Sequence, residues 1–216
     1  MRSVSDEAQA LHQQGREAGS SGDPVRALEL FNRARELAPD WAYPPYDMAF
    51  TYLLHDHLEE AERWYAVVDA LEPRGFFTSK TSLDTVRRER AGELPQGFAR
   101  TFAMLDWEPA DRQRIALQQI VERHPSFAPA WQKLAFLTDD EDARLEMIDR
   151  GLAAHPDDET YGVLVSNKAM VLDRRGQRSE ARRMLRDLLS DPRCTAGTEA
   201  TTKAFCAGLL SDGDPG

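Results

Sequence analysis

The feature that most constrains this chain is a residue pattern that returns after 34 positions. Small, apolar and proline residues of the first copy have counterparts in the second. The matched pairs are Gly15 and Ala49, Ala27 and Ala61, Phe31 and Tyr65, Ala34 and Val68, Leu37 and Leu71, and Pro39 and Pro73. A fixed period of this length is typical of proteins in which one small unit stacks on the next. The chain is therefore expected to form a stack of similar units rather than one compact core.

The spacing inside each copy is that of two packed α-helices. Apolar residues recur three and four positions apart, and no segment alternates apolar and polar residues as a half-buried strand does. A small residue such as Gly15 lets the two helices approach, and Pro39 ends the second helix. Proline and glycine divide the chain into about twelve predicted helices. Their ranges are 3–19, 23–38, 42–55, 58–71, 77–91, 96–106, 109–124, 127–138, 140–154, 158–175, 178–190 and 196–211.

These residues and their spacing resemble the tetratricopeptide repeat (TPR), a helix-turn-helix unit of 34 residues. Two full-length units, 8–41 and 42–75, match well, and parts of the signature return later. The later matches are Trp131, Leu134 and Ala135, then Ala169, Gly176, Ala181, Leu185, Leu188 and Pro192. The resemblance implies an all-α fold: a right-handed superhelix (α-solenoid) of about five helical hairpins, with one inserted helix and a C-terminal capping helix.

The intervals between helix-ending prolines locate the irregular parts. Pro73 follows Pro39 by 34 residues, but Pro125 follows Pro73 by 52, which leaves 18 residues beyond one unit. That surplus is the length of one extra helix, assigned to 77–91. A single domain over 1–216 is expected. Its parts are units 8–41 and 42–75, the inserted helix 76–93, units 94–127, 128–158 and 159–195, and the cap helix 196–211.

In the TPR family, the first helix of each unit lines a concave groove that holds a partner peptide. Carried over by position, the resemblance assigns twelve residues to this groove. They are His12, Arg16, Tyr43, Tyr46, Asp47, Phe50, Gln132, Lys133, Phe136, Ser166, Asn167 and Met170. Among the units, the second has the most aromatic residues at these positions. Three interpretations of its rings stay open: packing in the core, contact with a partner side chain, or burial by the inserted helix 77–91, which would close the groove.

One subset of the family clamps a partner's C-terminal carboxylate with Lys, Asn and Arg side chains. This chain departs from that pattern, because His12 and Arg16 stand at the first-unit Lys and Asn positions. Asp47 stands where the second-unit Asn would be. A carboxylate at that position would repel another, so this binding mode is not expected.

No catalytic or metal-binding motif is found. The sequence lacks glycine-rich phosphate loops, a Gly-x-Ser-x-Gly elbow and a His-Glu-x-x-His motif. His55 and His57 are two positions apart, whereas two ligands on one helix face need a spacing of three or four. Cys194 and Cys206 are interpreted as structural or incidental thiols. The acids of 139–142 are interpreted as the favourable charges of a helix start. Neither a cofactor nor an enzymatic activity is expected.

Charge and composition exclude several classes of partner. The net charge of −10 argues against binding to a nucleic-acid backbone, and no apolar run is long enough to span a membrane. The absence of an apolar leader and the two cysteines favour a cytoplasmic protein. Residues 137–160 carry nine acids and two arginines, and residues 173–193 carry seven arginines and four acids. These stretches are either solvated helix faces or an electrostatic dock, for example between copies.

The expected function is that of an interaction scaffold, which binds a protein or peptide partner in the groove without catalysis. A second hypothesis is a self-assembling structural protein that forms a homo-oligomer through the groove or the charged surfaces. A small enzyme on a helical scaffold is a remote third hypothesis without positive evidence in the sequence. Sedimentation at low and high salt separates the first two, because a dock made of charges dissociates in salt.

Overall fold

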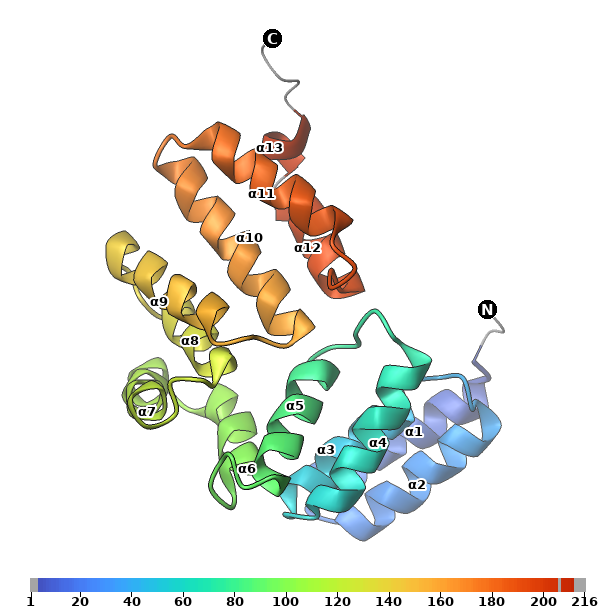
Figure 1. Ribbon diagram of the computed structural model, residues 1–216. Helices are drawn as coiled ribbons and strands as arrows, with labels where there is room; N and C mark the ends of the chain where they lie inside the picture. Colours follow the sequence, from blue (N-terminus) through green and yellow to red (C-terminus); the bar gives the residue numbers. More distant parts are fainter. Residues whose placement is uncertain (1–3, 206, 212–216) are drawn as a thin grey trace. The chain divides into compact units, whose positions relative to one another are not determined.

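The computed structural model describes residues 4–205 and 207–211, and within these ranges the chain is helical, without strands (Figure 1). The first group of helices is α1 (Asp6–Ser20), α2 (Pro24–Leu37), α3 (Tyr43–Leu54), α4 (Leu58–Leu71), α5 (Ser79–Arg90) and α6 (Phe98–Met104). The second is the 3-10 turn η1 (Leu105–Trp107), α7 (Ala110–Arg123), α8 (Ala128–Phe136), α9 (Glu141–Ala153), α10 (Asp158–Arg174), α11 (Arg178–Ser190), α12 (Ala196–Phe205) and α13 (Ala207–Ser211).

The helix boundaries predicted from proline and glycine agree with the structure to within a few residues. The helix expected at 58–71 is α4, and the one expected at 178–190 is α11. In the range 196–211 the described residues form α12 and α13. Cys206, between these two helices, lies outside the described residues. Local helix-breaking residues therefore predict most of the element order.

The contacts divide the chain into two compact units, with the boundary between Met104 and Leu105. The first unit contains α1–α6, and the second contains η1 and α7–α13. The boundary falls inside the range 94–127 that was expected to be one repeat. That the whole chain behaves as a single domain stays a prediction.

In the first unit, two helical hairpins stack through the predicted repeat positions. The first consists of α1 and α2, the second consists of α3 and α4, and α2 packs on α3. Gly15 lies against the ring of Phe31, where an added Cβ would be 2.6 Å from the nearest ring carbon. Its counterpart Ala49 is fully buried, as are Ala61 and Tyr65. The TPR-like pattern of small and aromatic residues therefore forms the hairpin core. The helix α5 packs on α4, and α6 packs on α5 and α3.

Three hairpin turns share one backbone geometry. Gly22, Asp56 and Gly176 each adopt a positive φ, at 83°, 59° and 79°. In each turn the next residue donates its N–H to the carbonyl five residues earlier, at 2.9, 3.0 and 2.9 Å. This is the hydrogen bond of a Schellman helix end, which favours glycine at the left-handed position. The repeat is thus visible in the turns as well as in the core, with Asp56 as the one non-glycine residue of the three.

In the second unit, α8 and α9 form one hairpin and α10 and α11 form the next, with α9 packed on α10. The helix α7 packs on α8, while α12 packs on α10 and α13 packs on α11. Thr198 packs directly against Gly162, where an added Cβ would lie 2.4 Å from the threonine Oγ1. Arg182 is buried and donates its Nε–H to the carbonyl of Leu209 at 2.9 Å. The two last helices therefore cover the final hairpin, which confirms the predicted C-terminal cap and the all-α hairpin stack.

Candidate partner-binding site

His12 and Asp47 bind each other between the first two hairpins. His12 Nε2 lies 2.7 Å from Asp47 Oδ2, and the histidine is 6% exposed. The imidazole also contacts the Trp41 ring edge-on, with the centroids 4.9 Å apart. Arg16, one turn further along α1, is exposed. Two residues that were expected to face a partner are thus engaged in joining α1 to α3.

The aromatic side chains of α3 are met by two phenylalanines from the loop before α5. Tyr43 contacts Phe76 and Phe77 at centroid distances of 4.9 and 5.5 Å, both edge-on. Tyr46 contacts the same two rings at 5.6 and 5.4 Å. Such tilted and edge-on pairs are the favoured geometry of aromatic side chains. Phe50 is half-buried and packs against the core of the second hairpin.

This arrangement narrows the three interpretations of the aromatic residues. Phe76 and Phe77 lie at the start of the expected inserted segment 76–93, so this segment does contact Tyr43 and Tyr46, while its helix α5 packs on α4. The residues that cover them precede the helix in the loop between α4 and α5. A polar contact across this junction joins the Tyr46 and Thr78 hydroxyls, which are 3.0 Å apart.

Phe77 holds an unusual position in this loop. Its φ is +50°, and 62% of its surface is exposed. For a bulky residue the left-handed region is disfavoured and costs on the order of 1–3 kcal/mol. The ring contacts with Tyr43, Tyr46 and Phe76 oppose that cost. The conformation of Phe77 is therefore maintained by the rings on which it rests.

A shallow hollow in the second unit collects three of the candidate residues from two hairpins. It has a volume of about 190 Å3. Its lining is Phe136 and Ala135 from α8, Arg144 and Ile148 from α9, and Asn167, Met170, Val171 and Arg174 from α10. Phe136 is 75% exposed and Met170 37% exposed. Because these two exposed apolar side chains line the same hollow, they are a candidate contact surface.

The remaining candidates in the second unit have other partners. Lys133 forms an ion pair with Asp106 of η1. The Ser166 hydroxyl lies 3.0 Å from that of Thr202 on α12. Gln132 is half-buried on α8. Position in the repeat thus indicates the helix face on which a residue lies, but not whether its side chain already binds a neighbouring side chain.

The acidic and basic stretches pair with each other within the second unit. Arg174 Nε lies 2.6 Å from Glu141 Oε1, and Arg175 reaches Asp142 at the same distance. The hydrogen bond from Arg174 holds the pKa of the Glu141 carboxyl below its ordinary value, against the effect of desolvation. These charges link α9 to α10. The acidic start of α9 is also confirmed as a helix N-terminus, since Asp140 accepts the Ala143 N–H at 2.8 Å.

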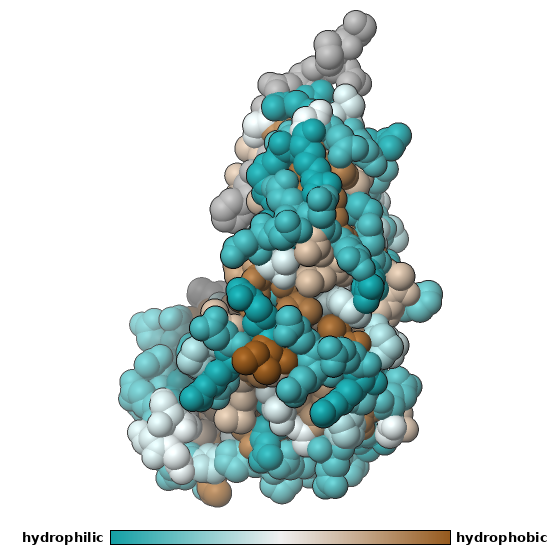
Figure 2. Space-filling model, turned by 90° about the vertical axis from the view of Figure 1, so that its left-hand side faces the viewer, coloured by the Kyte–Doolittle hydropathy of each residue, from teal (hydrophilic) through white to brown (hydrophobic). Residues whose placement is uncertain are grey.

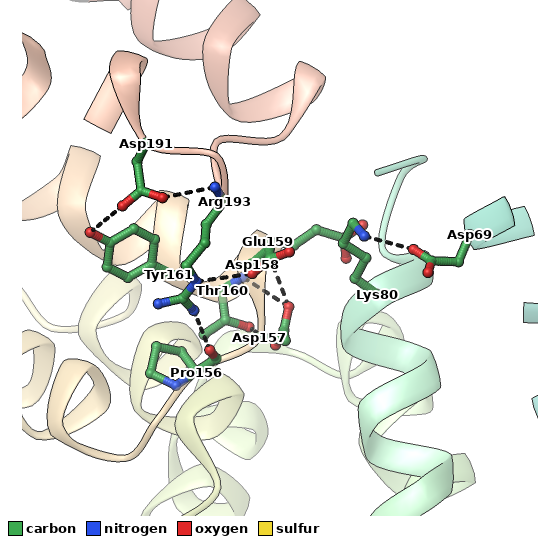
Figure 3. Close-up of polar contacts among 10 residues, drawn as sticks. All are labelled: Asp69, Lys80, Pro156, Asp157, Asp158, Glu159, Thr160, Tyr161, Asp191 and Arg193. Carbon is green, nitrogen blue, oxygen red and sulfur yellow. Dashed lines mark hydrogen bonds and ion pairs between the residues drawn. The ribbon is translucent and has the colours of Figure 1, made fainter. Parts of the chain in front are cut away.

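Arg193 makes a second such link, between the end of α11 and the start of α10 (Figure 3). Its Nε lies 2.9 Å from Asp158 Oδ1, and its guanidinium lies 4.1 Å from the centre of the Tyr161 ring. The Tyr161 hydroxyl donates to Asp191 at 3.3 Å. Burial and the Asp191 carboxylate raise the pKa of Tyr161. Sequence reasoning missed this cluster, because its members are 30 to 35 residues apart.

A larger hollow in the first unit, of about 370 Å3, is lined mostly by charged residues of α4 and α5. Burial alone would raise the pKa of Glu62, but hydrogen bonds from Arg90 and Arg87 outweigh it and lower that pKa. Lys80 adds an ion pair with Asp69 at 2.6 Å (Figure 3). These contacts fasten α5 to α4. Among the lining residues of the hollow the apolar side chain is the small Ala66, which offers little surface to anchor a partner.

The described residues contain no group of three His, Cys, Asp or Glu side chains placed to hold a metal ion. Within the same ranges, no helix combines the length and apolar character needed to cross a membrane. His55 Nδ1 lies 2.9 Å from the Thr51 carbonyl, and Cys194 is buried. Figure 2 shows one face of the molecule, which is largely hydrophilic with separate hydrophobic patches.

No protein-family model matches the sequence, and no curated protein matches it. Among solved structures, the chain is similar to residues 41 to the end of MamA from Desulfovibrio magneticus RS-1, with 14% identity, 87% of this chain and 96% of that chain covered, and a TM-score of 0.40. TTC0263, a thermophilic TPR protein of Thermus thermophilus, is 17% identical, with 94% of this chain and 98% of that chain covered and a TM-score of 0.39. YrrB, described as a TPR protein with an unusual peptide-binding site, is 14% identical, with 96% of this chain and 97% of that chain covered and a TM-score of 0.36. Similarity at this level carries no information on function.

Proposed function

We propose that the protein is an interaction module that binds a segment of a protein partner in the hollow of the second unit and has no chemistry of its own. The observation that carries this proposal is the meeting of Phe136, Asn167 and Met170 in one hollow, although they come from two separate hairpins. The two apolar side chains are exposed to water, so their burial by a partner is favourable.

The chemistry of the hollow fits one large side chain with its backbone. Apolar walls from Phe136, Met170 and Ile148 would receive an aliphatic or aromatic side chain. The Asn167 amide forms no hydrogen bond with any described residue, and an amide can both donate to and accept from a peptide backbone. An anchor residue in an apolar pocket with a polar rim is the usual centre of a protein interface.

Peptides selected from a random library for binding to the intact protein test this proposal. Phe136→Asp/Met170→Asp places two charges on the apolar walls, so we expect at least a tenfold loss of affinity in calorimetry. Ile115→Asp is the matched control, since Ile115 is 58% exposed on α7 and is not part of the hollow lining. Equal affinity of the wild type and the folded double variant would reject the hollow as the site.

Self-assembly is the second candidate, and exposed apolar residues of the second unit favour it. Trp107 is 64% exposed and Ile115 58% exposed, so each is an apolar side chain that a second copy could cover. The charged stretches support a dock less strongly, because their members pair within the unit. A homo-oligomer would appear in sedimentation as a concentration-dependent mass. Its persistence at high salt would indicate apolar rather than ionic contacts. A monomer at every concentration would remove this candidate.

A further inference from the structure

We propose that residues 72–78 act as an internal ligand of the aromatic face of α3, and that a partner segment with two adjacent aromatic side chains binds this face by displacing them. The aromatic face is defined as Tyr43 and Tyr46, with Trp41 and His12 beside them. The proposal concerns the first unit and is independent of the hollow in the second.

The first step is that the face already holds an aromatic pair. Phe76 and Phe77 are adjacent in sequence, and each contacts both Tyr43 and Tyr46 at centroid distances between 4.9 and 5.6 Å. The two phenylalanine rings also contact each other at 4.6 Å. The face therefore accommodates two neighbouring rings, which defines the chemistry of a partner that could replace them.

The second step is that the platform beneath these rings belongs to the folded hairpins. Tyr46 also contacts the fully buried Tyr65 of α4, with the centroids 5.9 Å apart. On the other side Tyr43 contacts His12 and Trp41. These contacts do not involve the loop and are kept when Phe76 and Phe77 leave, whereas the hydroxyl contact between Tyr46 and Thr78 is lost. A partner would meet a preformed surface, which lowers the entropic cost of binding.

The third step is that the loop can leave without dismantling the fold. Its backbone hydrogen bonds are local: Gly75 donates to the Glu72 carbonyl at 2.8 Å, and Ser79 donates to the Phe76 carbonyl at 3.0 Å. The helices on either side remain joined by the ion pair of Lys80 with Asp69. Phe77 is largely exposed and has a positive φ, so its release also relieves a disfavoured backbone conformation.

The test supplies the internal ligand in trans. The full chain carrying Phe76→Ser/Phe77→Ser is titrated with a synthetic peptide of residues 72–80, and the wild type is titrated in parallel. We expect the double variant to bind this peptide at least ten times more tightly than the wild type, whose own segment competes. A peptide with both phenylalanines replaced by serine is expected not to bind either protein.

Two further variants separate this site from the hollow of the second unit. Phe136→Ser, added to the double variant, should leave the peptide affinity unchanged, and Tyr43→Ala should abolish it. Loss of binding with Phe136→Ser would place the peptide in the hollow and overturn the proposal, as would equal affinities of the wild type and the double variant. Circular dichroism checks folding, and if the double variant unfolds, Phe77→Ser alone replaces it under the same criteria.

Discussion

At Gly15 a single missing methyl group decides how closely the first two helices approach. An added Cβ would lie 2.6 Å from the Phe31 ring, and that ring is buried. We expect Gly15→Ala to lower the free energy of unfolding by about 1–3 kcal/mol, the usual cost of overpacking. Gly19→Ala is the matched control in the same helix, since its Cβ would be 3.6 Å from that of Ala27. It should be neutral or stabilising by up to about 1 kcal/mol. Urea unfolding measures both, and equal losses would contradict the steric explanation.

Asp56 occupies the turn position at which the first hairpin has Gly22. Its φ of 59° is disfavoured for a residue with a Cβ, so Asp56→Gly should raise the unfolding free energy by about 0.5–1 kcal/mol. The substitution also removes an ion pair with Arg100, but both side chains are about half exposed and such pairs contribute little. Asp56→Asn removes the same charge and keeps a Cβ. Identical changes in melting temperature for the two variants would show that charge, not backbone conformation, matters at this position.

At the scale of elements, the ion pairs between α9 and α10 make the second unit sensitive to acid. The pKa of Glu141 is lowered in the folded chain by the hydrogen bond from Arg174. Its contribution to stability is therefore complete above the unfolded-state pKa of about 4.5 and is lost as the pH falls through the lower folded-state pKa. Glu141→Gln should reduce the difference in urea midpoint between pH 7 and pH 3.

Glu146→Gln is the control for that experiment. Glu146 also carries a negative charge on α9, but it pairs with Arg150 one turn along the same helix and does not reach α10. This variant should keep the pH dependence of the wild type. An unchanged pH dependence in Glu141→Gln, measured at low ionic strength, would show that the pairs between α9 and α10 do not stabilise the unit.

The elements also show what sequence could predict. Helix ends were predictable because they depend on local residues such as Pro39 and Gly176. The ring contacts of Phe76 and Phe77 with α3 were not predictable. These residues lie in a loop outside the repeat and contact a helix about 30 positions away. For the same reason the pairing of the acidic and basic stretches was missed: composition shows the charges, but only the fold places Arg174 beside Glu141.

Sequence position brought together some of the candidate residues, whereas their role in binding stays a prediction. Phe136, Asn167 and Met170, which the resemblance assigned to first helices of two neighbouring hairpins, line one hollow. His12 and Asp47 were assigned to the groove in the same way, yet they face each other and form a hydrogen bond. Repeat position predicts the face of a helix, whereas the partner of each side chain depends on its neighbours in space.

At the scale of the whole molecule, the division at Met104 predicts that the two units unfold separately. In repeat proteins stability is approximately a sum of terms between neighbours, so a local change need not spread. In native-state hydrogen exchange, Gly15→Ala should therefore reduce protection in α1–α4 and leave α8–α11 unchanged. An equal loss in both units would instead show one cooperative domain over 1–216.

The central claim is that the hollow between α8, α9 and α10 receives a protein segment. The most direct measurement is an NMR titration of the isotope-labelled intact protein with a library-selected peptide. The account predicts that the largest amide and methyl shifts fall on Ala135, Ile148 and Met170, with little change on the outer face of α11. Shifts confined to α11, or to the first unit, would contradict the claim that the hollow is the binding site.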